Sequence, residues 1–220
     1  MHVTQGCSKF GHPEFELETG ELPEPLVTFL VRFIENRVAS GARFEVGQHA
    51  QIGSNLLRVA AAGDRLTFLE RVPGTEDEWE RSCARTLMAM YRQRCCLESV
   101  GMLDQLSYPA PDSFAMVCKR VDEAPAVVFL RQSVDEGSGW AVVCADEDHD
   151  HDNVDELLAT TVQTMCENVA LFEIFVAMPA GTLVVREGDR IVAFDHDRKA
   201  LEILPDSFLD RLRQQGGWTV

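Results

Sequence analysis

The spacing of apolar residues alternates along the chain between steps of three or four and steps of two, which predicts helices and strands in turn. A first helix is predicted from Pro25 to Ser40, where the apolar positions are Leu26, Phe29, Leu30, Phe33 and Ile34. Further helices are predicted over Thr75–Val100 with a Thr75–Glu78 capping box, from Asn153 to about Glu167, and from Asp206 to near Gly216.

Short runs of β-branched and aromatic residues predict strands between these helices. They cover Ile52–Ala60, Leu66–Val72, Phe114–Val121, Ala126–Arg131, Trp140–Ala145, Leu183–Arg186 and Ile191–Phe194. Phe172–Met178 is apolar throughout and is compatible with either a strand or a helix. Turn residues such as Glu187-Gly188-Asp189 join neighbouring strands into antiparallel hairpins. We therefore expect an α+β fold, in which mainly antiparallel sheets pack against one or two helices.

A break in the helical pattern near the middle of the chain predicts a domain boundary. Gly101–Pro111 contains one glycine and two prolines, which interrupt the preceding helical pattern. The chain has 220 residues, enough for two small domains. We expect an N-terminal α+β domain over residues 1–108 and an acidic C-terminal α+β domain over residues 109–220.

Charge narrows the range of partners. The formal net charge is -16, and residues 106–220 carry -12 of it, from 9 basic and 21 acidic side chains. Such a surface repels phosphate, so we expect no direct binding to nucleic acid and none to an anionic membrane. A basic protein is the partner that this charge favours, although acidity can also serve solubility alone.

The seven cysteines and the N-terminus predict the compartment. Several cysteines lie in apolar runs, and neither a C-x-x-C pair nor a finger-like Cys/His spacing is present, so we expect neither disulfides nor a metal framework. Residues 1–15 lack the basic and apolar regions of a signal peptide, and no apolar run approaches the length of a membrane span. These features predict a cytoplasmic protein with reduced thiols.

Motifs of common enzyme classes are missing from the sequence. A G-x-S-x-G elbow, a phosphate-binding G-x-x-x-x-G-K-[ST] loop and a G-x-G-x-x-G turn are all absent, and the three lysines suggest no nuclease-like arrangement with carboxylates. We therefore expect a binding protein with no catalytic residues and no cofactor.

One segment combines possible metal ligands with strong negative charge: residues 146–152, which read DEDHDHD. Its alternating aspartates resemble a calcium loop, but His151 stands where glycine is needed and Leu157 where glutamate is needed. His149 and His151 could contribute to a transition-metal site if a distant third ligand exists. The remaining interpretations are a solvated acidic loop and a surface that binds a protein partner.

The C-terminal half also contains a recognisable series of motifs. Val127–Arg131 is followed by Asp135, by Gly139-Trp140, by the acidic Ala145–Asp148 and by Pro179–Thr182. Over about Phe114–Arg186 the chain resembles a family of small bacterial domains marked by a D-S-G-W strand and a G-D-E-D loop. That family occurs as immunity proteins of polymorphic toxin and type VI secretion systems. Here Ala145 replaces the family's glycine, and the loop carries two histidines.

The resemblance implies an antitoxin that neutralises its cognate toxin effector by tight binding. A cytoplasmic antitoxin implies a toxin that acts in the cytoplasm, and a basic nuclease fits the acidic surface. The expected mechanism is occlusion of the nuclease cleft by acidic residues, namely Asp146, Glu147, Asp148, Asp150, Asp152, Asp155 and Glu156. Two alternatives remain: a metal-dependent hydrolase that uses His149 and His151, and an adaptor domain unrelated to toxins.

Overall fold

The computed structural model describes residues 1–75, 77–146, 148–169 and 171–214. Five α-helices and three mainly antiparallel sheets occur among these residues, which confirms the α+β class. The chain divides into two compact units, Met1–Tyr91 and Arg92–Val220, and the division lies within a helix upstream of Gly101–Pro111. The boundary at residue 108 stays a prediction. None of the described helices has the length and apolar character that a bilayer span requires.

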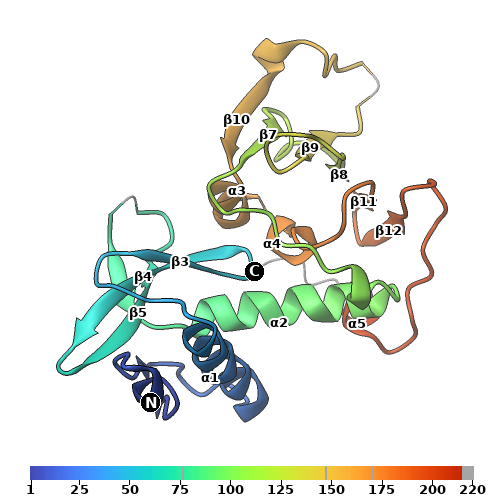
Figure 1. The fold of residues 1–220 in the computed structure, drawn as a ribbon. Helices are drawn as coiled ribbons and strands as arrows, with labels where there is room; N and C mark the ends of the chain where they lie inside the picture. Colours follow the sequence, from blue (N-terminus) through green and yellow to red (C-terminus); the bar gives the residue numbers. More distant parts are fainter. Residues whose placement is uncertain (76, 147, 170, 215–220) are drawn as a thin grey trace. The chain divides into compact units, whose positions relative to one another are not determined.

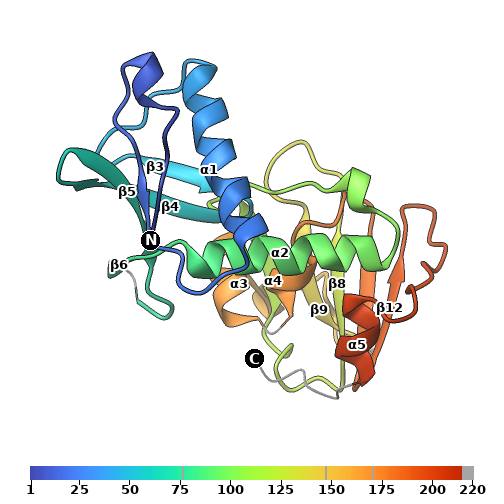
Figure 2. The ribbon, with the colours of Figure 1, turned by 90° about the horizontal axis from the view of Figure 1, so that it is seen from below.

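The first unit is built around a four-stranded sheet in the order β3-β4-β5-β6 (Figure 1 labels β3, β4 and β5, and Figure 2 labels β6). Its elements are β1 (His2–Val3), β2 (Glu16–Leu17), α1 (Glu24–Ala39), β3 (His49–Ile52), β4 (Asn55–Ala62), β5 (Arg65–Arg71), β6 (Trp79–Arg81) and the start of α2 (Ala84–Ser99). Helix α1 lies where the periodicity predicts it. Its Leu30 and Ile34 are fully buried in one cluster with Val59 and Phe68 from the sheet.

The predicted helix Thr75–Val100 is wrong over its first third. Trp79–Arg81 pairs with Leu69–Arg71 as strand β6, and α2 begins only at Ala84. The carboxylate of the buried Glu70 accepts hydrogen bonds from the backbone N–H groups of Thr86 (2.7 Å) and Arg85 (3.3 Å) in the first turn of α2. A side chain from the sheet therefore sets the start of this helix, in place of the Thr75–Glu78 capping box.

The second unit contains a six-stranded sheet in the order β10-β7-β9-β8-β11-β12. The strands are β7 (Phe114–Cys118), β8 (Ala126–Arg131), β9 (Trp140–Cys144), β10 (Leu157–Thr161), β11 (Leu183–Glu187) and β12 (Arg190–Phe194). The β7–β9 pair is parallel, and the other pairs in this sheet are antiparallel. As a result, the C-terminal ends of β7 and β9 lie side by side at one end of the sheet, which we call the sheet edge.

The predicted helix Asn153–Glu167 is wrong in its first half. A short 3-10 helix, η3 (Val154–Glu156), leads into β10, and Leu157–Thr161 pairs with the whole of β7 before α3 (Val162–Asn168) begins. Strand pairing thus overrides a local pattern that is compatible with a helix. The ambiguous segment Phe172–Met178 contains a helix, α4 (Phe172–Phe175). The last helix is α5 (Phe208–Gln214), and the predicted end at Gly216 lies outside the described residues.

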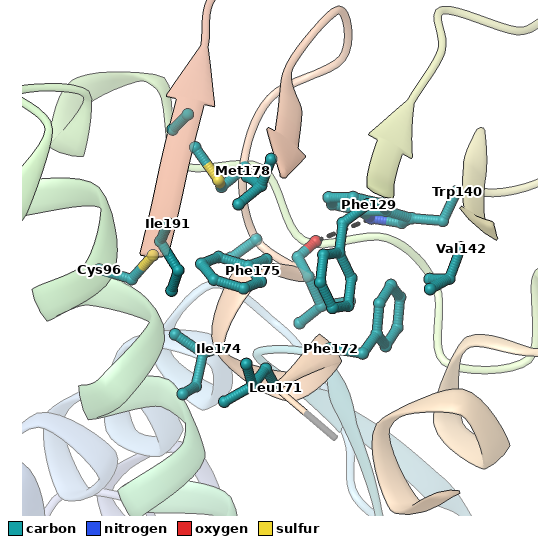
Figure 3. Packing of buried hydrophobic residues seen from close by; sticks show 14 of the residues in the cluster. Cys96, Phe129, Trp140, Val142, Leu171, Phe172, Ile174, Phe175, Met178 and Ile191 are labelled. Atoms are coloured by element: carbon teal, nitrogen blue, oxygen red, sulfur yellow. Dashed lines mark hydrogen bonds between the residues drawn. The ribbon is translucent and has the colours of Figure 1, made fainter. Parts of the chain in front are cut away.

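The segment of α3 and α4 lies over one face of the six-stranded sheet (Figure 2). The ring centroids of Phe172 and Trp140 are 5.3 Å apart, and those of Phe175 and Phe129 are 5.2 Å apart. The indole Nε1–H of Trp140 donates a 3.1 Å hydrogen bond to the backbone oxygen of Val176 (Figure 3). This contact fixes the apolar segment to β9 and satisfies the polar atom of a buried indole.

Candidate functional site

The predicted partner-binding residues lie in the connection between β9 and β10. The connection leaves β9 at Cys144, and β10 begins at Leu157, opposite Cys118 at the end of β7 (Figure 1). Because β7 and β9 are parallel neighbours, both of these cysteines stand at the edge of the sheet that the loop crosses. The topology therefore brings a loop rich in acids and histidines against two strand ends.

The aspartates of this loop face solvent. Asp146, Asp148, Asp150, Asp152 and Asp155 are all exposed, and Glu147 lies outside the described residues. The side chains of Asp146, Asp150 and Asn153 each accept a hydrogen bond from the backbone N–H two residues later, at 3.0, 3.0 and 3.1 Å. Such Asx turns shape the backbone locally. The second carboxylate oxygen of Asp146 and of Asp150 remains available for other contacts.

The two histidines of the loop point the other way. The side chain of His149 is only 3% exposed, His151 is half-buried, and their ring centroids lie 4.6 Å apart. The segment Asp148–Asp152 thus alternates exposed aspartates with inward-facing imidazoles. The interpretation as a solvated acidic loop therefore applies to the aspartates and not to the two histidines.

Both histidines meet the two cysteines at the sheet edge. Cys144 continues the inward-facing series of Trp140 and Val142 along β9, and both Cys118 and Cys144 are buried. Their Sγ atoms lie 3.8 Å apart. All seven cysteines of the chain are free thiols, so this pair is close without being bonded.

The four side chains form one compact cluster of possible ligand atoms. The Nδ1 atom of His149 lies 3.4 Å from the Sγ of Cys118 and 3.0 Å from that of Cys144. The Nε2 atom of His151 lies 3.3 Å from the Sγ of Cys144. One ligand atom from each residue falls within 4.8 Å of the others. The sequence indicates the two histidines as possible ligands, and the fold adds Cys144, five residues before His149, and Cys118, which is distant in sequence.

A second layer of contacts surrounds the cluster. The Nε2 atom of His149 lies 3.1 Å from the Oε2 of Glu156, a residue that the sequence assigned to partner binding. The backbone N–H of Arg120 donates to the Sγ of Cys118 at 3.3 Å. Glu156 therefore faces the cluster with a side chain that is 35% exposed, and its part in partner binding stays a prediction.

Electrostatics at the cluster disfavour a bare thiolate. Burial raises the pKa of the Cys144 thiol above its ordinary value. A hydrogen bond from the backbone N–H of Asp146 acts against this, whereas the neighbouring Cys118 and the Asp146 carboxylate act with it. In the absence of a cation, Cys144 is a protonated thiol at neutral pH.

Comparison with known proteins adds no assignment. No family model, curated protein or solved structure matches the chain.

Proposed function

We propose that the chain is an immunity protein, an antitoxin that binds a cognate toxin effector and blocks its active cleft. The proposed toxin is a basic nuclease that acts in the cytoplasm and is delivered by a type VI secretion system. The resemblance over Phe114–Arg186 supports this proposal, because that range covers four of the six strands of the second sheet completely and most of a fifth, β11.

The observation that carries the proposal is the row of exposed aspartates in the β9–β10 loop. Within the described residues, no lysine or arginine forms an ion pair with an aspartate of this loop, and the Glu156 carboxylate contacts the His149 imidazole. The charges of Asp148, Asp150 and Asp152 are therefore not neutralised by the chain's own basic side chains. A surface of unpaired like charges accelerates encounter with a partner of opposite charge and disfavours other partners.

The proposed mechanism is mimicry of phosphate. A nuclease cleft presents lysines and arginines that contact phosphate groups, and carboxylates can take the place of those groups. A groove beside the loop is lined by Glu123, Pro125, Ala126 and Ala145 among others, and it can receive a side chain of the partner. Apolar anchors of this kind slow dissociation, while the rim charges mainly set the association rate.

The cytoplasmic location is part of the proposal. Seven free cysteines are typical of proteins from a reducing compartment. A toxin that attacks nucleic acid acts in that same compartment.

The first test is capture of the tagged full chain from its native cells at low salt, with elution by high salt and mass spectrometry of the eluate. Recovery of one toxin-like basic protein at near-equal stoichiometry supports the proposal. Recovery of no such protein, from cells shown to make a toxin effector, contradicts it.

The second test addresses the loop itself and uses the captured toxin. The triple variant Asp148→Asn, Asp150→Asn, Asp152→Asn should associate at least tenfold more slowly at low salt, and its rate should depend less on salt. The matched control, Glu187→Gln, Asp189→Asn, Glu202→Gln, removes three exposed acids elsewhere in the same unit. Equal association rates for the two triple variants would show that the loop is not the contact surface.

A further inference from the structure

We propose that Cys118, Cys144, His149 and His151 form a zinc site that fixes the acidic loop to the edge of the six-stranded sheet. The site is a set of four protein ligands that come from the ends of β7 and β9 and from the loop.

The distances fit a tetrahedral ion with small adjustments. With Zn–S bonds of about 2.3 Å and Zn–N bonds of about 2.0–2.1 Å, a tetrahedron has S–S edges of about 3.8 Å and S–N edges of about 3.6 Å. The two Sγ atoms lie 3.8 Å apart, three of the four sulfur–nitrogen separations are 3.4, 3.0 and 3.3 Å, and the fourth, from Cys118 to His151, is within 4.8 Å. The imidazoles need to move outward by about 0.6 Å or less.

The ligand types select the metal. Two thiolates with two imidazoles suit zinc, whereas calcium, magnesium and manganese prefer oxygen ligands. The aspartates next to the histidines are exposed and lie outside the cluster of ligand atoms. Two thiolates would neutralise the charge of a divalent cation in this buried position.

The surroundings match those of a metal-bound histidine. A ligating imidazole usually donates its second N–H to a carboxylate, which fixes the tautomer and the ring orientation. His149 presents Nδ1 to the sulfurs and Nε2 to Glu156, at 3.1 Å. The Arg120 N–H on Cys118 provides the hydrogen bond that a coordinated thiolate accepts.

Four protein ligands leave no open position for water, so the site is of the structural class. This argues against the hydrolase alternative, which needs an exchangeable position on the metal. The role that remains is mechanical, since zinc would join two strand ends to a loop that has few apolar anchors. In the described part of the loop, Asp146, Asp148, Asp150 and Asp152 would then be held facing outward.

The metal site stands independently of the proposed function, whereas its role in presenting aspartates to a toxin rests on that function. The decisive experiment uses the full wild-type chain, without a histidine tag, purified under reducing conditions from zinc-supplemented medium. We expect about one zinc per chain by elemental mass spectrometry. Replacement by Co²⁺ should give the intense visible bands of a tetrahedral ion and a near-ultraviolet thiolate-to-cobalt charge-transfer band.

Variants assign the ligands. Cys118→Ser, Cys144→Ser and His149→Gln should each lower the zinc content of the purified chain several-fold. Cys144→His keeps a ligand but removes one thiolate, so it should retain cobalt with a weaker charge-transfer band even if the serine variants fail to fold. The controls are Cys95→Ser and His49→Gln, which change a cysteine and a histidine that belong to no cluster of possible metal ligands among the described residues and should retain zinc.

Proteolysis tests the mechanical role. A protease that cuts at aspartate should cleave the chelator-treated chain within residues 146–155 several-fold faster than the zinc-loaded chain. Wild-type protein that binds neither zinc nor cobalt, or that contains a Cys118–Cys144 disulfide, would overturn the site. Such a result leaves toxin capture unaffected, and failure to capture a toxin leaves the metal content unaffected, so the two proposals fail separately.

Discussion

Arg131 on β8 and Trp140 on β9 stand directly opposite each other, and the guanidinium carbon lies 5.7 Å from the centroid of the indole ring. Arg131 is only 7% exposed, and its partners are the backbone oxygens of Ser107 (2.7 Å), Met178 and Ser138 (3.4 Å). Burial lowers the pKa of Arg131 to about 10, so the side chain remains cationic at neutral pH. One buried cation thus connects two strands to three connecting segments of the chain.

Arg131→Lys should lower the free energy of unfolding by about 2 kcal/mol, because an ammonium cannot reproduce the planar fork that reaches carbonyls in different directions. Urea denaturation measures the change. Arg120→Lys, at an exposed position, is the matched control and should change stability by less than about 0.5 kcal/mol. Equal stability of the two variants would mean that the carbonyl contacts of Arg131 contribute little.

Gly139 should tolerate no side chain. Its φ is +75°, and a Cβ atom there would lie 2.1 Å from the backbone oxygen of Gln132. Gly139→Ala should therefore destabilise the chain by more than about 3 kcal/mol, because the strand backbone must shift. Gly188→Ala also has a positive φ (+54°) but meets no atom within 4 Å, so it should cost about 1 kcal/mol. A thermal-denaturation series that ranks the two variants equally would contradict the steric argument.

Glu14 should make the first unit sensitive to acid. Burial acts to raise the pKa of this carboxyl group, but hydrogen bonds from the Thr4 hydroxyl and from the backbone N–H groups of Ser8 and Cys7 lower it from 4.5 to about 2. The lowered pKa contributes stability that is fully present above about pH 4.5 and is lost as the pH falls toward 2.

Glu14→Gln should accordingly cost about 2 kcal/mol at pH 7 and progressively less as the pH falls from 4.5 to 2. Unfolding by urea across this pH range measures the difference between wild type and variant. Glu45→Gln removes an exposed carboxylate and serves as the control. A difference that is independent of pH would place the effect in packing instead of ionisation.

Glu156→Gln tests the outer layer of the proposed zinc site. Loss of the carboxylate that faces His149 Nε2 should weaken zinc binding about 10- to 100-fold in competition with a chelator, while the cobalt spectrum keeps its form because the four ligands remain. Asp155→Asn, at the preceding exposed position, should leave the affinity unchanged. Unaltered affinity in Glu156→Gln would remove Glu156 from the site.

Elements with strong local signals could be predicted from the sequence. Strand β8 was predicted over Ala126–Arg131 and has those bounds, because its alternation of buried and half-buried residues lies between clear turns. The predicted strand Ile52–Ala60 was less accurate: a turn at Gly53-Ser54 separates β3 from β4. Trp79–Arg81 and Leu157–Thr161 were predicted as helix and form strands, because partners distant in sequence decide their conformation.

The candidate site was likewise predictable only where its residues lie close together in the sequence. His149 and His151 were visible as possible ligands, and Cys144 lies five residues before His149. Cys118 lies 26 residues before Cys144, and only the parallel pairing of β7 with β9 brings their sulfurs together. No local spacing encodes that pairing. A search for Cys and His at the ends of predicted strands would have been the available signal.

The position of β9 has a consequence for synthesis of the chain on the ribosome. Strand β9 lies between β7 and β8, and the other neighbours of these two strands, β10 and β11, come still later in the sequence. Until Trp140–Cys144 emerges, β7 and β8 therefore have no neighbour in the sheet with which to pair. A nascent chain stalled before Trp140 would present two apolar strands with open edges, the kind of species that aggregates or recruits a chaperone.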